Sequence, residues 1–306
     1  MTHQPADDRF SIAPDWPGRA GALARLVIFA AGFMAASYGF NVLLAGVQRH
    51  IATLEGHILL SMAAIGVATM ILIAIMARVS GRPFGWYGYA GSGKVRNFTI
   101  GTVCAIALLA TQLSIEAALG CLSFGQVTAD AGTLARFGLF YAVLFLVVGF
   151  TEESLFRGYG LIELSRAISF WPTVLLSAVA FGLPHWLKGE GETAIGGIQA
   201  GLFGLALAYA FRETGSLWFA IGVHAGWDYG ETFIFGVPDS ALKLKGSVLH
   251  PAIAGPHWLT GGTAGPEGSV LALLPIAGFA LVAWQLGRWR SPSASSSPLE
   301  ARAGVD

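Results

Sequence analysis

Residues 137–158 read FGLFYAVLFLVVGFTEESLFRG, and this stretch decides how the chain folds. An apolar run begins at Phe137, and Glu152, Glu153 and Arg157 stand at its end. A charged side chain inside a bilayer costs between ~3 and more than 10 kcal/mol, so charged residues at that depth indicate a functional site. The stretch therefore predicts a site built into a membrane-spanning helix.

The spacing of these three charges predicts different roles for the two glutamates. Glu153 and Arg157 are four residues apart and share one face of a helix, so they can form an ion pair. The side chain of Glu152 points about 100° away from that face and has no local cation. We therefore expect Glu152 to be a general base that is supported by the Glu153–Arg157 pair. The alternative is that both glutamates lie at a helix end among lipid headgroups and are only solvated.

Composition places the whole chain in a membrane. Of its 306 residues, 54% are hydrophobic and 12% are charged, and the mean hydropathy is +0.63, which excludes an ordinary soluble domain. The formal net charge of zero gives no reason to expect nucleic acid as a partner. Cys104 and Cys121 have neither a metal-ligand spacing nor a disulfide pattern, so we interpret them as packing residues.

The pattern of apolar runs predicts an all-α, polytopic helical bundle with about eight transmembrane helices. A polar tail, residues 1–20, precedes a single membrane domain, residues 21–290, whose motifs lie in residues 137–230. Residues 291–306 are rich in Ser, Pro and Ala and are expected to be disordered. The predicted spans are Leu26–Val47, Ile58–Met76, Thr99–Leu119, Phe137–Ser165, Trp171–Trp186, Ala194–Phe211, Leu217–Tyr229 and Val270–Leu286.

The distribution of basic residues predicts the orientation of these spans. With eight crossings, 13 of the 18 lysines and arginines fall on one side and 5 on the other. The positive-inside rule then places both termini in the cytoplasm of a multi-pass cell-membrane protein. Between the last two spans, residues 233–269 have many Gly and Pro residues and no periodicity. We interpret this segment as a surface loop, the alternative being a lid that folds over a site.

Two histidine-containing motifs stand where apolar residues would be expected. His185 follows Phe181 by four residues, and His224 precedes Asp228 by four residues on the seventh span. At ~1.5 Å per residue, both histidines, Asp228 and Glu152 lie ~12–22 Å from the turns on one side of the membrane. All four residues are therefore inside the hydrocarbon layer at comparable depths. We expect them to converge in one cavity, because isolated polar groups would cost more.

A Glu, two His and an Asp in a membrane cavity suit hydrolysis in two ways. Glu152 and His185 could take a proton from water while His224 and Asp228 stabilise the oxyanion. Alternatively, the two histidines and an acid could hold Zn²⁺, with Glu152 as the base. The candidate ligands are Glu152, His185, His224 and Asp228. No His-Glu-x-x-His motif supports zinc, so we favour the mechanism that requires no cofactor. A transporter with a proton relay, or a membrane scaffold, could use the same polar cluster without catalysis.

These motifs resemble the CAAX-protease-and-bacteriocin-processing family of intramembrane proteases, also called CPBP, type II CAAX prenyl endopeptidase or Abi. Its pattern is Glu-Glu-x-x-x-Arg, then Phe-x-x-x-His, then His-x-x-x-Asn/Asp. The chain supplies Glu152-Glu153…Arg157, Phe181…His185 and His224…Asp228 in this order.

The resemblance implies an endopeptidase that cuts a peptide or protein substrate at the membrane, either prenylated or carrying a leader peptide. It implies that Glu152 and His185 activate water and that His224 and residue 228 lie beside the oxyanion. The family is often described as metalloproteases, although our favoured mechanism needs no metal. The prototype prenyl proteases have Asn where this chain has Asp228. An ionised Asp has no N–H to donate, so orienting His224 or binding a metal is the better expectation for Asp228.

Overall fold

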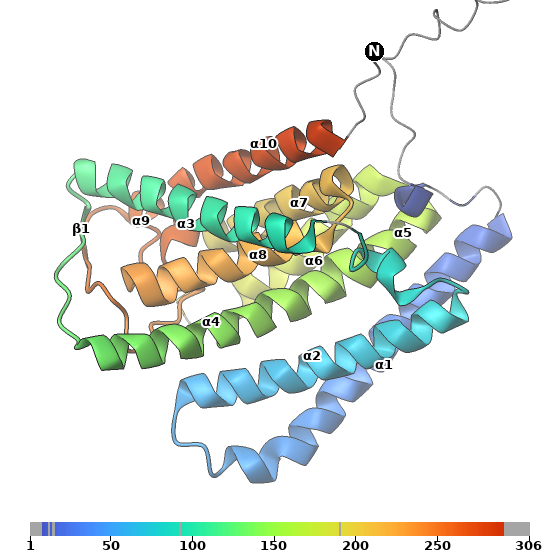
Figure 1. The fold of residues 1–306 in the computed structure, drawn as a ribbon, viewed down its shortest axis with the longest axis horizontal. Helices are drawn as coiled ribbons and strands as arrows, with labels where there is room; N and C mark the ends of the chain where they lie inside the picture. Colours follow the sequence, from blue (N-terminus) through green and yellow to red (C-terminus); the bar gives the residue numbers. More distant parts are fainter. Residues whose placement is uncertain (1–7, 12, 14–15, 92, 190, 291–306) are drawn as a thin grey trace, which may run out of the picture.

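The computed structural model describes residues 8–11, 13, 16–91, 93–189 and 191–290, and most of these belong to helices (Figure 1). Two helices continue as π-helices, η3 (Ser154–Gly160) after α4 and η4 (Gly230–Phe235) after α8. The all-α fold class is confirmed. The α-helices that form the bundle are α1 (Trp16–Gln48), α2 (Leu54–Val79), α3 (Lys94–Ala118), α4 (Ala131–Glu153), α5 (Leu161–Ile168), α6 (Phe170–Leu187), α7 (Ala194–Thr214), α8 (Leu217–Tyr229) and α10 (Leu273–Arg290).

Short polar residues set where several of these helices begin. Thr53, Thr193 and Ser216 precede α2, α7 and α8, and each side chain accepts a backbone N–H from the first turn. Such caps satisfy donors that have no partner inside the helix. Gly215 ends α7 with a φ of 61°, which a residue without a Cβ adopts at no steric cost. The sequence Thr214-Gly215-Ser216 therefore turns the chain sharply from α7 into α8.

Seven helical stretches in the described ranges are long and apolar enough to cross a membrane. They match seven of the predicted spans, and the fourth is one continuous stretch from Ala131 to Ile168 that includes η3 and α5. The remaining predicted span, the seventh in chain order, is α8, which has the predicted bounds but only 13 residues. The polytopic bundle is thereby confirmed, with α8 as its short central member.

The distribution of polar and apolar side chains is the reverse of that in a soluble protein. Large apolar side chains such as Ile28, Val67 and Leu176 are exposed on the outer helices, whereas Glu153 and Arg157 are fully buried. An exposed apolar surface of this kind indicates a hydrophobic surrounding. The bundle is therefore built to present its apolar side chains to lipid and its charges to its own interior.

Helix α8 occupies the centre of the bundle, where it packs against α3, α4 and α7 (Figure 1). All its residues from Phe219 to Asp228 are buried. A Cβ on Gly222 would lie 2.2 Å from the carbonyl oxygen of Phe98, so glycine at this position allows the backbones of α3 and α8 to approach closely. His224 and Asp228 are consequently held on a helix that has little freedom to shift.

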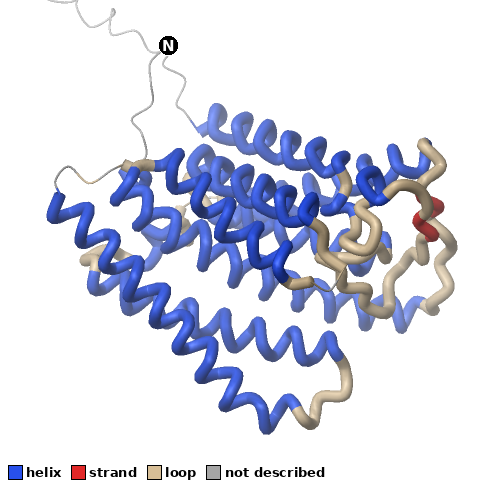
Figure 2. Tube along the Cα trace, turned by 180° about the vertical axis from the view of Figure 1, so that it is seen from behind, coloured by secondary structure: helices blue, strands red, loops and turns tan. Residues whose placement is uncertain are grey.

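The segment after η4 is packed against the bundle and is not a plain surface loop, which corrects our interpretation of residues 233–269. Its strand β2 (Ala252–Ile253) pairs antiparallel with β1 (Leu122–Ser123), and the short helices α9 (His257–Thr260) and η5 (Pro266–Gly268) follow. Figure 2 shows these loop segments and both strands gathered at one end of the bundle. Pairing with a distant strand gives hydrogen-bond partners to backbone N–H and C=O groups. This pairing needs no periodic pattern of apolar residues, so the sequence does not indicate it.

Helix α1 begins at Trp16, inside the stretch predicted as a polar tail over residues 1–20. Pro17 stands in the first turn. A backbone N–H at this place has no partner inside the helix, so proline, which has no N–H, loses nothing there, and its fixed φ favours the helix. The predicted boundary at residue 21 therefore falls inside a helix. The tail predicted for residues 291–306, like residues 1–7, 12, 14 and 15, lies outside the described residues.

Candidate active site

The two adjacent glutamates that end helix α4 have different surroundings. Glu153 Oε1 accepts a hydrogen bond from Arg157 Nη1 at 3.0 Å, and neither side chain is exposed. The side chain of Glu152 is 25% exposed and lines a cavity inside the bundle. The ion pair expected from the four-residue spacing is present, and Glu152 is the carboxylate that a water molecule can reach.

Arg157 is enclosed on several sides. It lies on the π-helix η3, a type of helix that frequently occurs at functional sites. The guanidinium carbon lies 4.4 Å from the ring centroid of Phe181, a cation–π arrangement. A Cβ on Gly204 would lie 2.4 Å from Arg157 Nη2, so glycine at position 204 leaves the space that the guanidinium fills. Helices α6 and α7 thus hold the cation that neutralises Glu153.

Glu153 also connects helix α4 to His224 on α8. Its Oε1 atom lies 2.8 Å from His224 Nδ1, in addition to its bond with Arg157. Because an ionised carboxylate only accepts hydrogen bonds, the Nδ1 atom must carry the proton. His224 is therefore held with Nδ1–H toward Glu153 and with Nε2 on the opposite side of the ring.

The Nε2 atom of His224 faces the two other carboxylates of the site. Glu152 Oε2 lies 3.8 Å from it and Asp228 Oδ2 lies 3.7 Å from it. Both distances exceed those of direct hydrogen bonds, and a water molecule can bridge polar groups at such separations. The carboxylates of Glu152 and Asp228 and the Nε2 atom of His224 thus surround one small space that a water molecule can occupy.

His185 enters the same cavity from helix α6. Its Nδ1 atom lies 2.7 Å from the carbonyl oxygen of Phe181, and its ring lies 4.8 Å from the Phe181 ring. A carbonyl can only accept, so Nδ1 donates and Nε2 of the neutral ring keeps a lone pair for another proton. Phe181 therefore supports two groups, the ring of His185 and the guanidinium of Arg157.

One cavity of about 380 Å³ joins these groups. Its volume is in the range typical of ligand-binding pockets, and most of its wall is apolar. A few polar side chains in a mainly apolar space interact more strongly than they would in water. Its lining includes the four residues Glu152, His185, His224 and Asp228 together with Leu144, Phe145, Val148, Phe203 and Phe279.

The structure thus places all four residues that the sequence proposed as catalytic on the wall of one cavity. Their chemical roles stay predictions. The geometry differs from expectation in one respect: the hydrogen bond that orients His224 comes from Glu153 at 2.8 Å, and Asp228 lies beyond hydrogen-bond distance at 3.7 Å. The four-residue spacing on one helix predicted a contact between Asp228 and His224. The contact between Glu153 and His224 joins two helices that are far apart in sequence, so no local spacing predicts it.

The donor atoms of these four residues do not fit a zinc site in this arrangement. Ligands of Zn²⁺ lie at about 2.0–2.2 Å, so two of them are at most about 4.4 Å apart. In the described part of the chain, one set of three or more His, Cys, Asp or Glu side chains brings its donor atoms within 4.8 Å of one another. That set is Glu231, Asp239 and Glu267, all of them outside the proposed catalytic residues.

Sequence reasoning missed the acidic groups that the segment after η4 brings to the cavity. Asp239 and Glu267 both line it. Burial and the neighbouring Glu267 raise the pKa of Asp239 to about 7. Glu231 lies seven residues after His224, and a carboxylate so close to the end of a buried helix is a signal that could have been noticed. Nothing in the sequence of residues 236–269 indicates that Asp239 and Glu267 meet it.

Residues 135–230 match the family described as Rce1-like, type II CAAX prenyl endopeptidase. The matched segment includes η3, helices α5 to α8 and most of α4. It therefore contains Glu152, Glu153, Arg157, Phe181, His185, His224 and Asp228. No curated protein and no solved structure matches this chain.

Proposed function

We propose, from the premise that residues 135–230 carry a domain of the type II CAAX prenyl endopeptidase family, that the protein is an intramembrane endopeptidase. Its substrate would be a membrane-associated peptide or protein, either prenylated or carrying a leader peptide. The observation that carries the proposal is the position of Glu152, whose carboxylate faces His224 at 3.8 Å inside the cavity. A base and a ring nitrogen on opposite sides of one small volume suit attack by water on a peptide carbonyl.

In the proposed reaction, Glu152 takes a proton from a water molecule, and the resulting hydroxide attacks the carbonyl carbon of the peptide bond. The oxyanion that forms accepts a hydrogen bond from Nε2–H of protonated His224. Glu152 then returns its proton to the leaving amine, which breaks the C–N bond. Proton and charge are balanced, and no metal takes part in any step.

Glu153 supports this mechanism by holding Nδ1 of His224, so that Nε2 points into the cavity. Preorganised donors stabilise charge at little reorganisation cost, which is the usual origin of large rate effects. Asp228 Oδ2 lies 3.7 Å from the same nitrogen, a separation that one water molecule can bridge. His185, whose Nε2 can accept a proton, is the second candidate for activating water.

The test uses purified protein in liposomes with two probes, a farnesylated peptide and the same peptide without its lipid. We expect cleavage in heavy-oxygen water to add one labelled oxygen to the new carboxylate. Replacing Glu152 by Gln keeps the shape but removes the base, and should slow cleavage by ~10²–10⁴-fold. Half-buried Glu55, in the first turn of α2 and outside the lining of the cavity, provides a matched Glu55→Gln control with wild-type activity.

Two results would contradict the proposal. One is wild-type cleavage by the Glu152→Gln variant. The other is the absence of any cleavage together with proton or solute flux that depends on Glu152, which would indicate a transporter.

The orientation of the chain also belongs to the proposal. The start of α1 and the end of α10 lie at the same end of the bundle (Figure 1), as an even number of crossings requires. Together with the excess of basic residues on that side, this supports two cytoplasmic termini. Reporter fusions at each terminus test it, and a signal from either terminus on the outer side would contradict it.

A further inference from the structure

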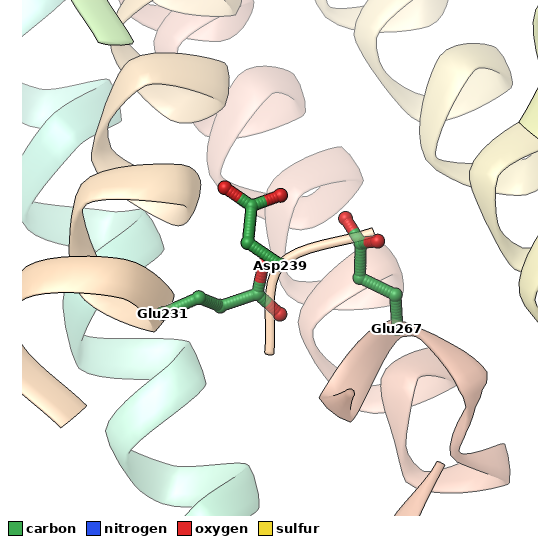
Figure 3. A group of neighbouring side chains, drawn as sticks. All are labelled: Glu231, Asp239 and Glu267. Atoms are coloured by element: carbon green, nitrogen blue, oxygen red, sulfur yellow. The ribbon is translucent and has the colours of Figure 1, made fainter. Parts of the chain in front are cut away.

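Three carboxylates meet beside the cavity, and none of them belongs to the proposed catalytic residues. Glu231 comes from η4, Asp239 from the loop that follows, and Glu267 from η5 (Figure 3). One oxygen atom of each lies within 4.8 Å of the others. We refer to these three residues as the carboxylate cluster.

The carboxylate cluster is not neutralised by ion pairs with cationic side chains. Among the described residues, no Lys, Arg or His forms an ion pair with any of its members. Lys188, which shares the cavity wall, donates to the carbonyl oxygen of Ser240 at 3.0 Å instead. Three acids in close contact repel one another unless a proton or a cation lies between them.

Glu231 is the member whose situation indicates a ligand most clearly. Its side chain is fully buried, and neither carboxylate oxygen has a hydrogen-bond partner. Figure 3 shows that it extends toward Asp239. A buried carboxylate without any partner is costly, because it has lost its water and gained nothing in return. The other two members each accept one hydroxyl hydrogen bond, Asp239 from Thr232 and Glu267 from Ser240.

We infer that the carboxylate cluster binds one hard divalent cation, Ca²⁺ or Mg²⁺. All the donor atoms are carboxylate oxygens, and such donors suit these two ions better than softer metals. Oxygens around Ca²⁺ lie at about 2.3–2.6 Å from the ion, so opposite ligands are about 4.6–5.2 Å apart. The observed limit of 4.8 Å between the cluster oxygens is compatible with one shared ion.

A cation at this place would connect the segment after η4 to the buried helix α8. Asp239 and Glu267 both line the cavity, so fixing them would also fix one part of its wall. The inference does not depend on the proposed hydrolysis, because binding and stability can be measured without a substrate.

The experiment uses the full chain in detergent, freed of metal with EDTA and then desalted. CaCl₂ and MgCl₂ are titrated separately at constant ionic strength, and calorimetric binding and the melting temperature Tm are recorded. We expect one of the two ions to bind with one site per chain, to raise Tm, and to slow hydrogen exchange in residues 236–269. Ligand that binds only the folded state raises stability by mass action.

Variants identify the site. Replacing Glu231 or Glu267 by Gln should weaken binding at least about tenfold, because each loses a charged ligand. Glu116 is the matched control: it is also fully buried and also has an unpartnered oxygen, but it lies outside the carboxylate cluster. The Glu116→Gln variant should bind the ion as the wild type does. If Glu231→Gln does not fold, Glu267→Gln, at a partly exposed position, decides the matter.

Two outcomes would overturn the inference. One is the absence of binding and of any Tm shift at about 10 mM of either ion, above the ~10⁻³ M dissociation constants of weak calcium sites. The second is binding with wild-type affinity by Glu267→Gln. The first result would mean that shared protons hold the three carboxyl groups together, and the second that the ion binds elsewhere.

Discussion

Two groups of carboxylates lie beside the same cavity and differ in how their charge is balanced. Around His224, the carboxylate of Glu153 contacts both Arg157 and the imidazole within 3.0 Å. In the carboxylate cluster, Glu231 is equally buried but has no hydrogen-bond partner. In the first group the charge of Glu153 is balanced by a cation of the protein itself. The second is incomplete without a ligand or a proton.

The largest expected effect on stability comes from breaking the balanced group. Replacing Arg157 by Met leaves Glu153 as a buried charge without its partner, which typically costs about 3–5 kcal/mol of unfolding free energy. Replacing Glu152 by Gln removes a partly exposed carboxylate that has no such partner, and its Tm should stay near that of the wild type. Thermal unfolding of both variants checks this, and equal melting temperatures would refute the assignment of the pair as the structural support.

A smaller effect is expected from crowding Arg157 without removing any charge. The methyl group of a Gly204→Ala variant would lie 2.4 Å from Arg157 Nη2, and Glu153 and Phe181 limit where the guanidinium can go. Overpacking of this kind costs about 1–3 kcal/mol.

Gly46 on α1 is the control for this variant, because a Cβ there has nothing within 4 Å. The Gly46→Ala variant should be neutral or more stable by up to about 1 kcal/mol, since Ala favours a helix over Gly. Chemical denaturation of both variants measures the difference. A Gly204→Ala protein as stable as the wild type would mean that Arg157 is not confined.

Asp130 is a solvent-exposed carboxylate, with which the two buried groups of carboxylates can be compared. Asp130 caps helix α4, where the hydroxyl and the backbone N–H of Thr133 lower its pKa. The cap therefore stabilises the fold above the ordinary pKa of Asp, and this contribution is lost as the pH falls through the lowered value. Replacing Asp130 by Ala should lower Tm at neutral pH by less than Gly204→Ala does.

The effect of Asp130→Ala should disappear in acid, where the wild-type carboxylate is protonated as well. Tm measured across the acidic range tests this. A difference from the wild type that persists at low pH would show that the residue acts through something other than its charge.

Removal of zinc is expected to have no effect on the cleavage rate. Because the donor atoms of the proposed catalytic residues do not fit a zinc ion, treatment with phenanthroline should leave the cleavage rate unchanged. Elemental analysis of the same preparation measures bound zinc directly. One zinc per chain, with activity that is lost on chelation and restored by zinc alone, would overturn the metal-free mechanism.

The sequence predicts well what depends on helix periodicity. The Glu153–Arg157 pair follows from a four-residue spacing, and the bounds of α8 follow from an apolar run between Ser216 and Gly230. The meeting of Glu152, His185 and His224 in one cavity follows from their depth along three spans. In these cases, one simple regularity relates position in the chain to position in space.

What depends on contacts between distant segments could not be predicted. The hydrogen bond between Glu153 and His224 joins residues 71 positions apart, and no local pattern indicates it. The carboxylate cluster needs the fold of residues 236–269, which have no periodicity and pair with β1 through backbone atoms. The single sequence is informative along each helix and uninformative about which loop packs over which helix end.

The most direct test compares the two adjacent glutamates in one experiment. Glu152→Gln and Glu153→Gln are purified side by side, and cleavage rate and Tm are measured on the same preparations. The expected result is that Glu152→Gln keeps the wild-type Tm while its rate falls by ~10²–10⁴-fold, and that Glu153→Gln melts at a clearly lower temperature. A Glu152→Gln protein that is folded and cleaves at the wild-type rate would contradict the central claim that Glu152 activates the water.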